Sequence, residues 1–481
     1  MGFTSDQTRR WLVLALTVTA QFMVILDVAV VVVALPEIKN DLGFSQESVQ
    51  WVVTAYSILF GGTLLLGGRL ADVLGRRRVF AAGVAVFAVG SLLSGIAWSE
   101  AALVGARALQ GFGGALLSPA ALSIIITTFP EGRERNRALG IWGGAAAAGG
   151  SAGVLLGGLL TSYASWPWIF YVNLPVAIVT LAATPFLLSE SRGLLAHRHF
   201  DIAGATTVTA GLMTLVYGLT YAGEHAWSDT RTIALLASSA VLLAAFFVIE
   251  WRSKAPLLPL RLFRSRMLSA ANATMIGVGA LAFGNFFVVT LYLQEVLGYS
   301  AIETGVAFIA ITLSIGVFSN IGPVLATRYG VRRVLSTGMA LSALGVLLYA
   351  QMPAGGHYFW DVFPALIVTG VGLGLTFVPV TIAALQGVSP ADAGIASGLI
   401  NTTRQIGGAV GIAAVTTIAA TVTADDTGVA PAEALTHGFH AAFYVLAAIA
   451  LLGALTAAAF LGRPRPSEEQ LDDVVILEEA A

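Results

Sequence analysis

The chain has 481 residues, of which 57% are hydrophobic and only 11% are charged, and its formal net charge is −2. A soluble domain carries about 25% charged residues, so this composition excludes an ordinary soluble protein and indicates a membrane protein. The absence of cysteine excludes a disulfide framework, a thiolate metal site and a cysteine nucleophile.

Fourteen apolar runs are long enough to be transmembrane helices, because a helix needs about 20 mostly apolar residues to cross a bilayer. We therefore predict an all-α polytopic membrane protein. The first run is longer than the apolar core of a cleavable signal peptide, so we expect it to be a transmembrane helix. The runs are residues 11–34, 49–70, 78–97, 101–127, 137–161, 168–188, 203–222, 231–250, 268–294, 303–327, 332–351, 361–385, 396–421 and 438–461.

The positively charged residues are concentrated on one side of these runs. With an even number of spans both termini share a side, and all but four of the 25 Lys and Arg residues fall on that side, the exceptions being Lys39, Arg107, Arg231 and Arg404. By the positive-inside rule this side is cytoplasmic. Because the richness in Arg, Ala, Val and Gly is typical of a high-GC bacterial genome, we expect a multi-pass protein of the bacterial cytoplasmic membrane with both termini in the cytoplasm.

The sequence contains an internal repeat. Residues 70–79 (LADVLGRRRV) and 325–334 (LATRYGVRRV) are identical at six of ten positions. Pro119 and Pro130 are matched by Pro379 and Pro390 at nearly the same offset. A Gly-Arg-Arg turn is common in the cytoplasmic loops of membrane proteins, but two matches at nearly one offset favour a true repeat. Related halves are typical of transporters, whose substrate site lies between them.

This repeat predicts the domain organisation. Two six-helix bundles occupy residues 1–190 and 267–462, and two inserted transmembrane helices with their cytoplasmic linkers occupy residues 191–266. Residues 463–481 are rich in Glu and Asp and form a short cytoplasmic tail.

Four motifs resemble those of the major facilitator superfamily. Residues 68–78 (GRLADVLGRRR) resemble the signature of its loop between helices 2 and 3. Residues 26–36 (LDVAVVVVALP), 107–111 (RALQG) and 397–408 (SGLINTTRQIGG) look like motifs of the fourteen-span drug:proton antiporter branch, which contains multidrug and antibiotic exporters. The resemblance covers residues 11 to about 461. The chain departs from the family pattern at Val32, where Asn is usual, and at Val154, where the helix 5 motif has proline.

Asp27 and Arg107 are the first candidates for chemistry. Asp27 is the only carboxylate well inside a span of the first half, and a charge at that depth is costly unless it is paired or solvated. At about 1.5 Å per residue both side chains lie equally far below the outer ends of their helices, so we expect an ion pair. Because burial favours the neutral acid and a cation favours the carboxylate, Asp27 could exchange a proton; the alternative is a static pair that fixes packing. In the resembled family these positions are implicated in proton coupling.

Asp72 lies among arginines at the end of the second span. The simplest interpretation is a solvated salt bridge that contributes less than about 1 kcal/mol. The resemblance implies a latch instead, in which this carboxylate docks on the N-terminus of the thirteenth span and closes the cytoplasmic side. Ser389 and Pro390 have the sequence of an N-cap and a first helical residue, whose free N–H groups attract an anion. We favour the latch, with the residues Gly68, Asp72, Gly75, Arg76, Arg77, Ser389 and Pro390.

Glycines form stripes along the fifth span. Gly149, Gly153 and Gly157 share one stripe, and Gly150 and Gly158 lie on the next. Small residues at four-residue spacing allow two helices to approach closely in lipid. We expect the first stripe to contact the other half of the protein. Close packing alone explains the pattern, and its link to the antiporter motif rests on the resemblance.

Further polar residues inside the spans are candidates for a substrate cavity. These are Gln21, Tyr56, Gln110, Asn285, Asn401 and Arg404. Glu295 and Asp361 lie near outer helix ends, where water reaches them, so we interpret them as rim residues rather than proton sites.

The positions of the two lysines bear on the energy source for transport. Lys39 and Lys254 are the only two and neither follows a glycine, so the chain has no G-x-x-x-x-G-K phosphate loop and must use an ion gradient. We predict a secondary active transporter, not an enzyme, that couples proton entry to efflux of hydrophobic drugs or antibiotics by alternating access. A lipid or amphiphile flippase is the alternative within transport. A membrane enzyme or sensor would need a polar cluster or soluble domain that the sequence lacks.

The expected partners are few. We expect a monomer in the lipid bilayer that binds a small hydrophobic substrate and protons. We expect no cofactor, metal ion, catalytic residue or nucleic acid.

Overall fold

The protein is helical, without strands, in the part that the computed structural model describes, residues 6–44, 48–191, 201–225, 227–253, 256–389, 392–426 and 428–461. The first half consists of α1 (Asp6–Leu42), α2 (Trp51–Leu74), α3 (Arg76–Gly95), α4 (Glu100–Thr128), α5 (Arg133–Tyr163), α6 (Trp168–Tyr171) and α7 (Asn173–Leu187). An inserted pair follows, α8 (Ile202–Glu224) and α9 (Thr230–Arg252). The second half consists of the 3-10 turn η1 (Leu260–Arg264), α10 (Arg266–Leu291), the π turn η2 (Tyr292–Val296), α11 (Ala301–Ala307), α12 (Ile309–Tyr329), α13 (Val331–Tyr349), the π turn η3 (Tyr358–Val362), α14 (Phe363–Leu385), α15 (Ala393–Asp425) and α16 (Pro431–Phe460).

Fourteen segments of the described chain are long and apolar enough to cross a membrane, which confirms the predicted number of spans. The sixth is made of α6 and α7, and the tenth of α11 and α12. Several helices are longer than expected: α1 continues through Pro36 to Leu42, and α16 begins at Pro431 instead of residue 438. Hydropathy marks only the part of a helix inside the hydrocarbon, whereas its backbone hydrogen bonds continue into the polar boundary.

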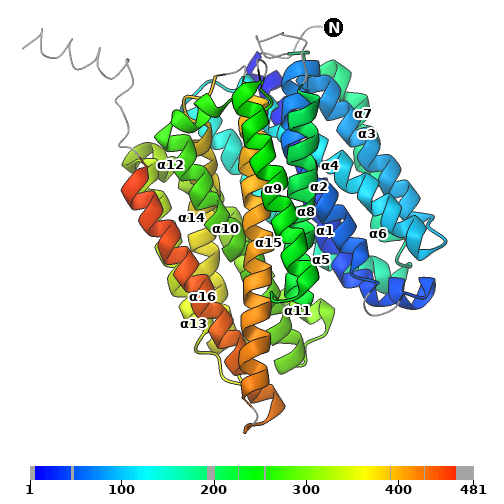
Figure 1. Cartoon of the computed structure of the whole chain (residues 1–481), viewed down its shortest axis with the longest axis vertical. Coiled ribbons are helices and arrows are strands. Elements are labelled where there is room, and N and C mark those ends of the chain that lie inside the picture. Colours follow the sequence, from blue (N-terminus) through cyan, green and yellow to red (C-terminus); the bar gives the residue numbers. More distant parts are fainter. Residues whose placement is uncertain are drawn as a thin grey trace, which may run out of the picture.

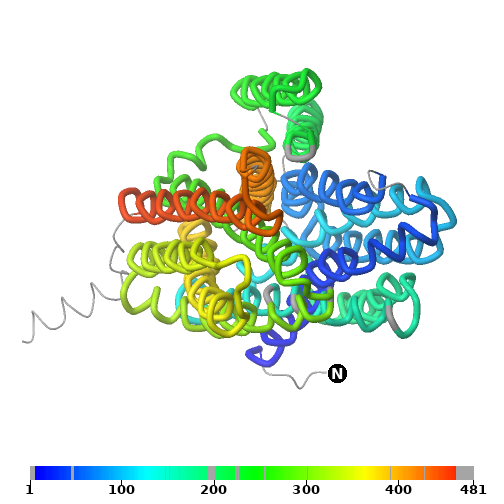
Figure 2. The backbone as a smooth tube through the Cα atoms, turned by 90° about the horizontal axis from the view of Figure 1, so that it is seen from below, coloured from blue at the N-terminus to red at the C-terminus, as the bar shows by residue number. Residues whose placement is uncertain are grey.

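The spans form two bundles side by side (Figure 1), with the inserted pair on the outside. Figure 2 shows the α8–α9 pair standing out from the body, and α8 packs against both α2 and α15. Both ends of the described chain lie at the same end of the molecule, which is the upper end in Figure 1. We call this end the termini face.

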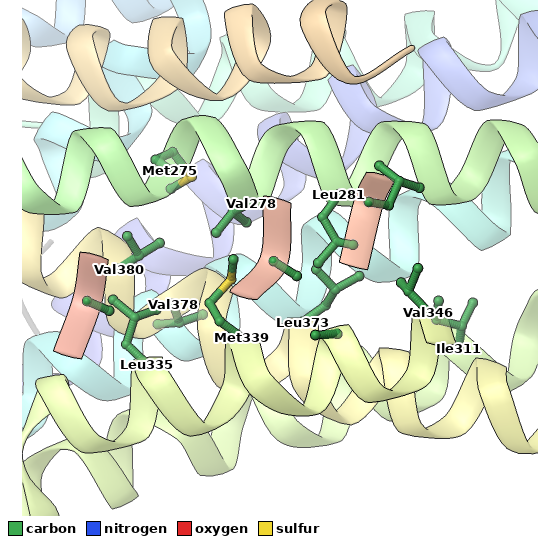
Figure 3. Packing of buried hydrophobic residues seen from close by; sticks show 14 of the residues in the cluster. Met275, Val278, Leu281, Ile311, Leu335, Met339, Val346, Leu373, Val378 and Val380 are labelled. Atoms are coloured by element: carbon green, nitrogen blue, oxygen red, sulfur yellow. The ribbon is translucent and has the colours of Figure 1, made fainter. Parts of the chain in front are cut away.

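The largest hydrophobic core lies in the second bundle and extends into the first. Figure 3 shows how side chains of four helices interdigitate there, namely Met275, Val278 and Leu281 of α10, Ile311 of α12, Leu335, Met339 and Val346 of α13, and Leu373, Val378 and Val380 of α14. The same cluster includes Leu122 and Trp142 of the first bundle. Because lipid is as apolar as these side chains, close packing rather than escape from water holds the bundles together.

The internal repeat is visible in the helix packing. In each bundle two helices cross at glycine, α3 over α4 and α13 over α14. A Cβ atom on Gly83 would lie 3.0 Å from the carbonyl oxygen of Gly113, and one on Gly338 would lie 3.0 Å from that of Gly372. About two turns further along, Gly90 contacts Gln110 and Gly345 contacts Thr369. The two halves are therefore equivalent at the level of individual backbone contacts.

Candidate functional site

Asp27 lies at the centre of a buried polar cluster in the first bundle. It is 0% exposed on α1, and its carboxylate accepts three hydrogen bonds. Arg107 Nη1 of α4 donates to Oδ2 at 2.6 Å, and Gln110 Nε2, one turn along α4, donates to Oδ1 at 2.6 Å. Asn173 Nδ2, the first residue of α7, donates to Oδ1 at 2.8 Å. The ionised carboxylate is thus paired with a cation and fully hydrogen-bonded, as a buried charge requires.

A second layer of contacts fixes these donors. Ser91 Oγ of α3 accepts hydrogen bonds from Gln110 at 3.2 Å and Asn173 at 3.0 Å, and donates to the carbonyl of Phe170 at 2.9 Å. Arg107 Nε donates to the carbonyl of Val52 at 3.1 Å, near the start of α2. The guanidinium therefore links Asp27 on α1 to the backbone of α2.

The ring of Tyr56 covers the Arg107 guanidinium. The Cζ atom of Arg107 lies 4.5 Å from the ring centroid, within the range of a cation–π interaction. The Tyr56 hydroxyl is buried and has no hydrogen-bond partner among the described residues. It is a spare polar group next to the ion pair.

The cluster breaks the symmetry of the repeat. By the offset that relates Gly113 to Gly372, the counterparts of Arg107 and Gln110 are Leu366 and Thr369. Packing glycines recur in both bundles, but the arginine and the glutamine do not. A charged cluster that only one half retains is more readily explained by chemistry than by the helix packing that both halves share.

The structure brings Asp27 and Arg107 together, as their depth in the spans predicted. Gln110, expected in a substrate cavity, binds Asp27 instead, and Tyr56 contacts Arg107. The sequence analysis missed Ser91 and Asn173. Each is an isolated polar residue in an apolar run, a weak signal that gives no partner by itself.

Asp72 binds the N-terminal turn of α15. Its Oδ1 and Oδ2 atoms accept hydrogen bonds from the backbone N–H groups of Gly394 and Ile395, both at 3.0 Å, and Arg76 Nη2 lies 3.1 Å from Oδ1. The Asp72 and Arg76 side chains are buried, so the interpretation of Asp72 as a solvated salt bridge is wrong. The carboxylate joins the two bundles at the termini face by binding a helix N-terminus.

The helix N-terminus that binds Asp72 differs in detail from the sequence prediction. The helix α15 begins at Ala393 with Asp392 at the N-cap position, so Ser389 is not its N-cap. The hydroxyl of Ser389 donates to Asp392 Oδ2 at 2.9 Å. Pro390 lies outside the described residues. The preceding helix α14 ends at Leu385 and α15 does not begin until Ala393, and a Ser-Pro pair read locally does not reveal this start.

Arg76, the first residue of α3, is held by hydrogen bonds to two other parts of the chain. Its Nε atom donates to Ser123 Oγ at 2.7 Å, and its backbone N–H donates to the Ser191 carbonyl at 3.1 Å. Gly75 has a φ of 107°, a conformation that favours glycine, and a Cβ atom there would overlap the Glu190 carboxylate. The guanidinium of Arg77 lies 3.8 Å from that carboxylate.

Glycines allow α2 and α15 to approach at the Asp72 contact. A Cβ atom on Gly68 would overlap the carbonyl oxygen of Gly394, and one on Gly398 would lie 2.9 Å from the carbonyl oxygen of Leu64. The crossing therefore requires small residues from both bundles. We call Gly68, Asp72, Arg76, Gly394 and Ile395 the α2–α15 junction.

The linker after the inserted pair reaches this junction. Glu250 near the end of α9 is buried, and its two carboxylate oxygens accept the backbone N–H groups of Leu257 and Leu258, both at 3.0 Å. Three residues later, Arg261 Nη2 lies 3.0 Å from Asp392 Oδ1 at the N-cap of α15. The linker thus connects α9 to the start of α15. The sequence analysis did not identify these residues.

The glycine stripe of α5 contacts α1, not the other half, so that prediction was wrong. Cβ atoms on Gly149, Gly153 and Gly157 would meet the backbone of α1 at Phe22, Leu26 and Val30, respectively. The next stripe faces the second bundle at two positions: Gly158 lies against Ile302, and Val154 lies against Gly305. Helix rotation, which a repeat of small residues does not specify, decides which neighbour each stripe contacts. The stripe packs on the two turns of α1 that flank Asp27.

Two cavities lie between the bundles. A cavity of about 180 Å³ at the termini face is lined by helix ends of both, including Arg135 and Asn136 of α5 and Thr327 of α12. Deeper, a cavity of about 10 Å³ is lined by Asn401 and Arg404, together with Leu122, Trp142, Met275, Phe377, Thr381 and Ile400. Gln21 and Asn285 are not among the lining residues of either cavity, although both are buried and carry side-chain atoms that lack partners among the described residues.

A family model described as Major Facilitator Superfamily matches residues 17–412. The chain belongs to the Major Facilitator Superfamily. Its structure is similar to that of the human organic anion transporter MFSD10, with a TM-score of 0.67 over 93% of this chain and 99% of that one, at 15% sequence identity. The superfamily fold accounts for the two bundles and, with the fourteen spans, for the inserted pair.

Several relatives of this superfamily member are bacterial export or resistance proteins. The cephamycin export protein of Amycolatopsis lactamdurans is 40% identical over 91% of this chain and 90% of its own length. The puromycin resistance protein of Streptomyces alboniger is 39% identical over 93% and 91%, respectively. The tetracenomycin C resistance and export protein of Streptomyces glaucescens is 36% identical over 84% and 75%. This Major Facilitator Superfamily member is therefore a membrane transporter rather than an enzyme.

Proposed function

We propose that this transporter exports drugs or antibiotics across a bacterial cytoplasmic membrane in exchange for protons, by alternating access. The relatives named for export of, or resistance to, cephamycin, puromycin and tetracenomycin C support the substrate class. The observation that carries proton coupling is the buried cluster of Asp27, Arg107, Gln110 and Asn173.

In this proposal Asp27 is the proton carrier. Its ionised form is held by a cation and two amide donors, and adding a proton removes the charge that holds them. Arg107 is then free to change its contacts, and it is also bound to the Val52 carbonyl at the start of α2. The other end of α2 carries Asp72, so the same helix connects the proton site to the α2–α15 junction.

Alternating access requires contacts between the bundles that break in turn. At the termini face, which the positive-inside rule makes cytoplasmic, the α2–α15 junction is closed. Further from this face, Val154 of α5 packs against Gly305 of α11. We propose that protonation and substrate binding exchange these two closures around the deeper cavity, which is lined by Asn401 and Arg404. In one state Asp27 takes up a proton from outside, and in the other it releases the proton into the cytoplasm.

The experiment has two steps. Expression in a pump-deficient host is tested against a panel that includes cephamycin, puromycin, lincomycin and tetracenomycin C, with and without a protonophore. Everted membrane vesicles are then energised, and a compound to which expression gave resistance is added while the internal pH is followed. Wild-type protein should release protons from the vesicles when the compound is added, and Asp27→Asn should not, because an amide cannot exchange a proton. Glu37→Gln is the matched control, since Glu37 is exposed on the same helix.

The outcomes separate the parts of the proposal. Proton release by Asp27→Asn equal to wild type, at equal protein level, would rule out Asp27 as the coupling acid. If expression gave resistance to none of the compounds in the panel, this result would contradict drug export itself.

A further inference from the structure

Arg404 differs from the other buried arginines of the described residues. Three arginines are buried in the part of the chain that the structure describes, and two of them face a carboxylate: Arg107 binds Asp27, and Arg76 binds Asp72. Arg404 is only 6% exposed, yet its Nε atom has no hydrogen-bond partner and no carboxylate lies within ion-pair distance among those residues. Its guanidinium group lies over the ring of Phe377, and the ring centroid is 5.4 Å from Cζ.

An unpaired buried cation destabilises a protein, and in a membrane protein such a group is retained chiefly for function. Arg404 lies 11 residues into α15, roughly 16 Å from the start of that helix at 1.5 Å per residue. This depth is about half of the hydrocarbon thickness. It is the level at which transporters built from two halves bind their substrates.

A second donor without an acceptor lies on the same cavity. The indole Nε1 of Trp142 on α5 is buried and has no hydrogen-bond partner among the described residues. Trp142 and Arg404 both line the cavity of about 10 Å³ between the bundles. Indole and guanidinium groups donate hydrogen bonds and cannot accept them, so the two side chains together call for an acceptor, and the guanidinium favours an anionic one.

We infer that Arg404 and Trp142 bind the acidic group of the exported compound, and that amphipathic organic anions are a substrate class of this transporter. This inference rests on the proposed export function. A carboxylate or phenolate oxygen of the compound accepts hydrogen bonds from the guanidinium and the indole. The cavity as it stands holds no more than about one water molecule, so the apolar remainder of the compound packs against its lining side chains, Leu122, Met275, Phe377 and Ile400, once the bundles have separated. Because Trp142 belongs to the first bundle and Arg404 to the second, such a compound contacts both halves at once.

The cavity at the termini face supplies a route to this site. Leu139 of α5 lines the larger cavity and Trp142, one turn further along, lines the smaller one. On α14, Ile382 lines the larger cavity and its neighbour Thr381 lines the smaller one. The two cavities therefore follow each other along the same two helices. In this proposal a compound that enters from the termini face reaches Arg404 when the bundles separate there.

The test compares two ligands with the same apolar part. Purified full-length protein is titrated with pyrenebutyrate, a carboxylate, and with pyrenebutyramide, its neutral amide, and the midpoint of thermal unfolding is recorded. Wild type should be stabilised more by the carboxylate than by the amide. Arg404→Gln should lose this preference, Arg404→Lys should keep part of it, and Trp142→Phe should weaken binding of the carboxylate. Ligand-free Arg404→Gln should unfold at the same temperature as wild type or higher, because the substitution removes an unpaired charge.

A packing role for Arg404 gives a different result. Ligand-free Arg404→Gln would then unfold at a lower temperature than wild type, with no difference between the two ligands in either protein. Equal stabilisation of wild type by both ligands, stabilisation by neither, or an unchanged preference in Arg404→Gln would each overturn the inference.

Vesicle transport separates this inference from the proposed function. If Arg404→Gln still couples proton release to export of a neutral or cationic compound and fails only with carboxylates, both stand. If wild type couples protons to export but treats the carboxylate and the amide alike, the export function stands and the anion site is rejected. If wild type binds the carboxylate through Arg404 but exports no compound, the site stands and the proposed function fails.

Discussion

The carboxylate of Asp72 accepts the backbone N–H of Gly394, a residue 322 positions later in the chain. This contact joins the end of α2 in one bundle to the first turn of α15 in the other, and Arg76 holds the same carboxylate from the side. The repeat equivalent of Asp72 is Thr327 on α12, whose hydroxyl accepts a hydrogen bond from Asn136 Nδ2 on α5 at 3.0 Å. The two related crossings at the termini face are thus held differently, one by a charge and one by neutral groups.

Asp72→Asn should open the termini face. A carboxylate at a helix N-terminus contributes up to about 2 kcal/mol when partly buried, so its loss should change the population of the open state several-fold. Because the chain has no cysteine, Leu65→Cys on α2, buried beside α15, is a unique label site, and its reaction with a maleimide should become faster in Asp72→Asn.

The control for this experiment is Glu134→Gln. Glu134 forms an ion pair with Arg10 at 3.5 Å at the same end of the molecule, but both side chains are largely exposed. Such pairs contribute about 0–1 kcal/mol, so labelling should not change. Labelling in Asp72→Asn that matches wild type would reduce Asp72 to a local contact without influence on opening.

Arg107→Gln should reduce proton-coupled export. Without the guanidinium the buried Asp27 carboxylate has no cation beside it, and removing one partner of a buried pair leaves a charge that is costly to bury. Proton release from energised vesicles on addition of an exported compound should therefore fall. Arg107→Lys, which keeps the charge, should lie between this variant and wild type. Proton release equal to wild type, at equal protein level, would show that the ion pair is not needed for coupling.

Asn173→Ala tests the part of the cluster that sequence analysis missed. It removes one of the two donors to Asp27 Oδ1 and one of the donors to Ser91. A hydrogen bond to a charged group contributes about 1.5–3 kcal/mol, so proton release from vesicles should fall, as in Arg107→Gln. The loss should be smaller, because the Gln110 donor remains. Proton release equal to wild type, with normal expression, would mean that Asn173 serves packing only.

Gly153→Ala should destabilise the first bundle. A Cβ atom there would lie 2.7 Å from the carbonyl oxygen of Leu26 and 2.7 Å from the Cβ of Ala29, so α5 must move away from α1. Overpacking of this kind costs about 1–3 kcal/mol and should lower the melting temperature of the purified protein. Gly150→Ala is the matched control, because no atom lies within 4 Å of its Cβ position. Equal melting temperatures for the two variants would contradict the close contact between these helices.

The sequence alone determined the number of spans, the repeat and the pairing of Asp27 with Arg107. Each follows from local quantities: the length of an apolar run, the identity of residues at a fixed offset, and the depth of a charge in its helix. A helix in lipid satisfies its own backbone hydrogen bonds, so its existence depends little on its neighbours. For the same reason the superfamily could be recognised from short motifs.

The tertiary structure decided which faces of those helices meet. Ser91 and Asn173 complete the Asp27 cluster, the glycine stripe of α5 packs on α1, and α15 begins at Ala393, none of which the sequence specified. Within the described residues it also left Arg404 without a counter-charge, which no inspection of α15 by itself predicts. The physical reason is that side-chain partners depend on the rotation and crossing of helices, which close packing between segments far apart in the chain fixes.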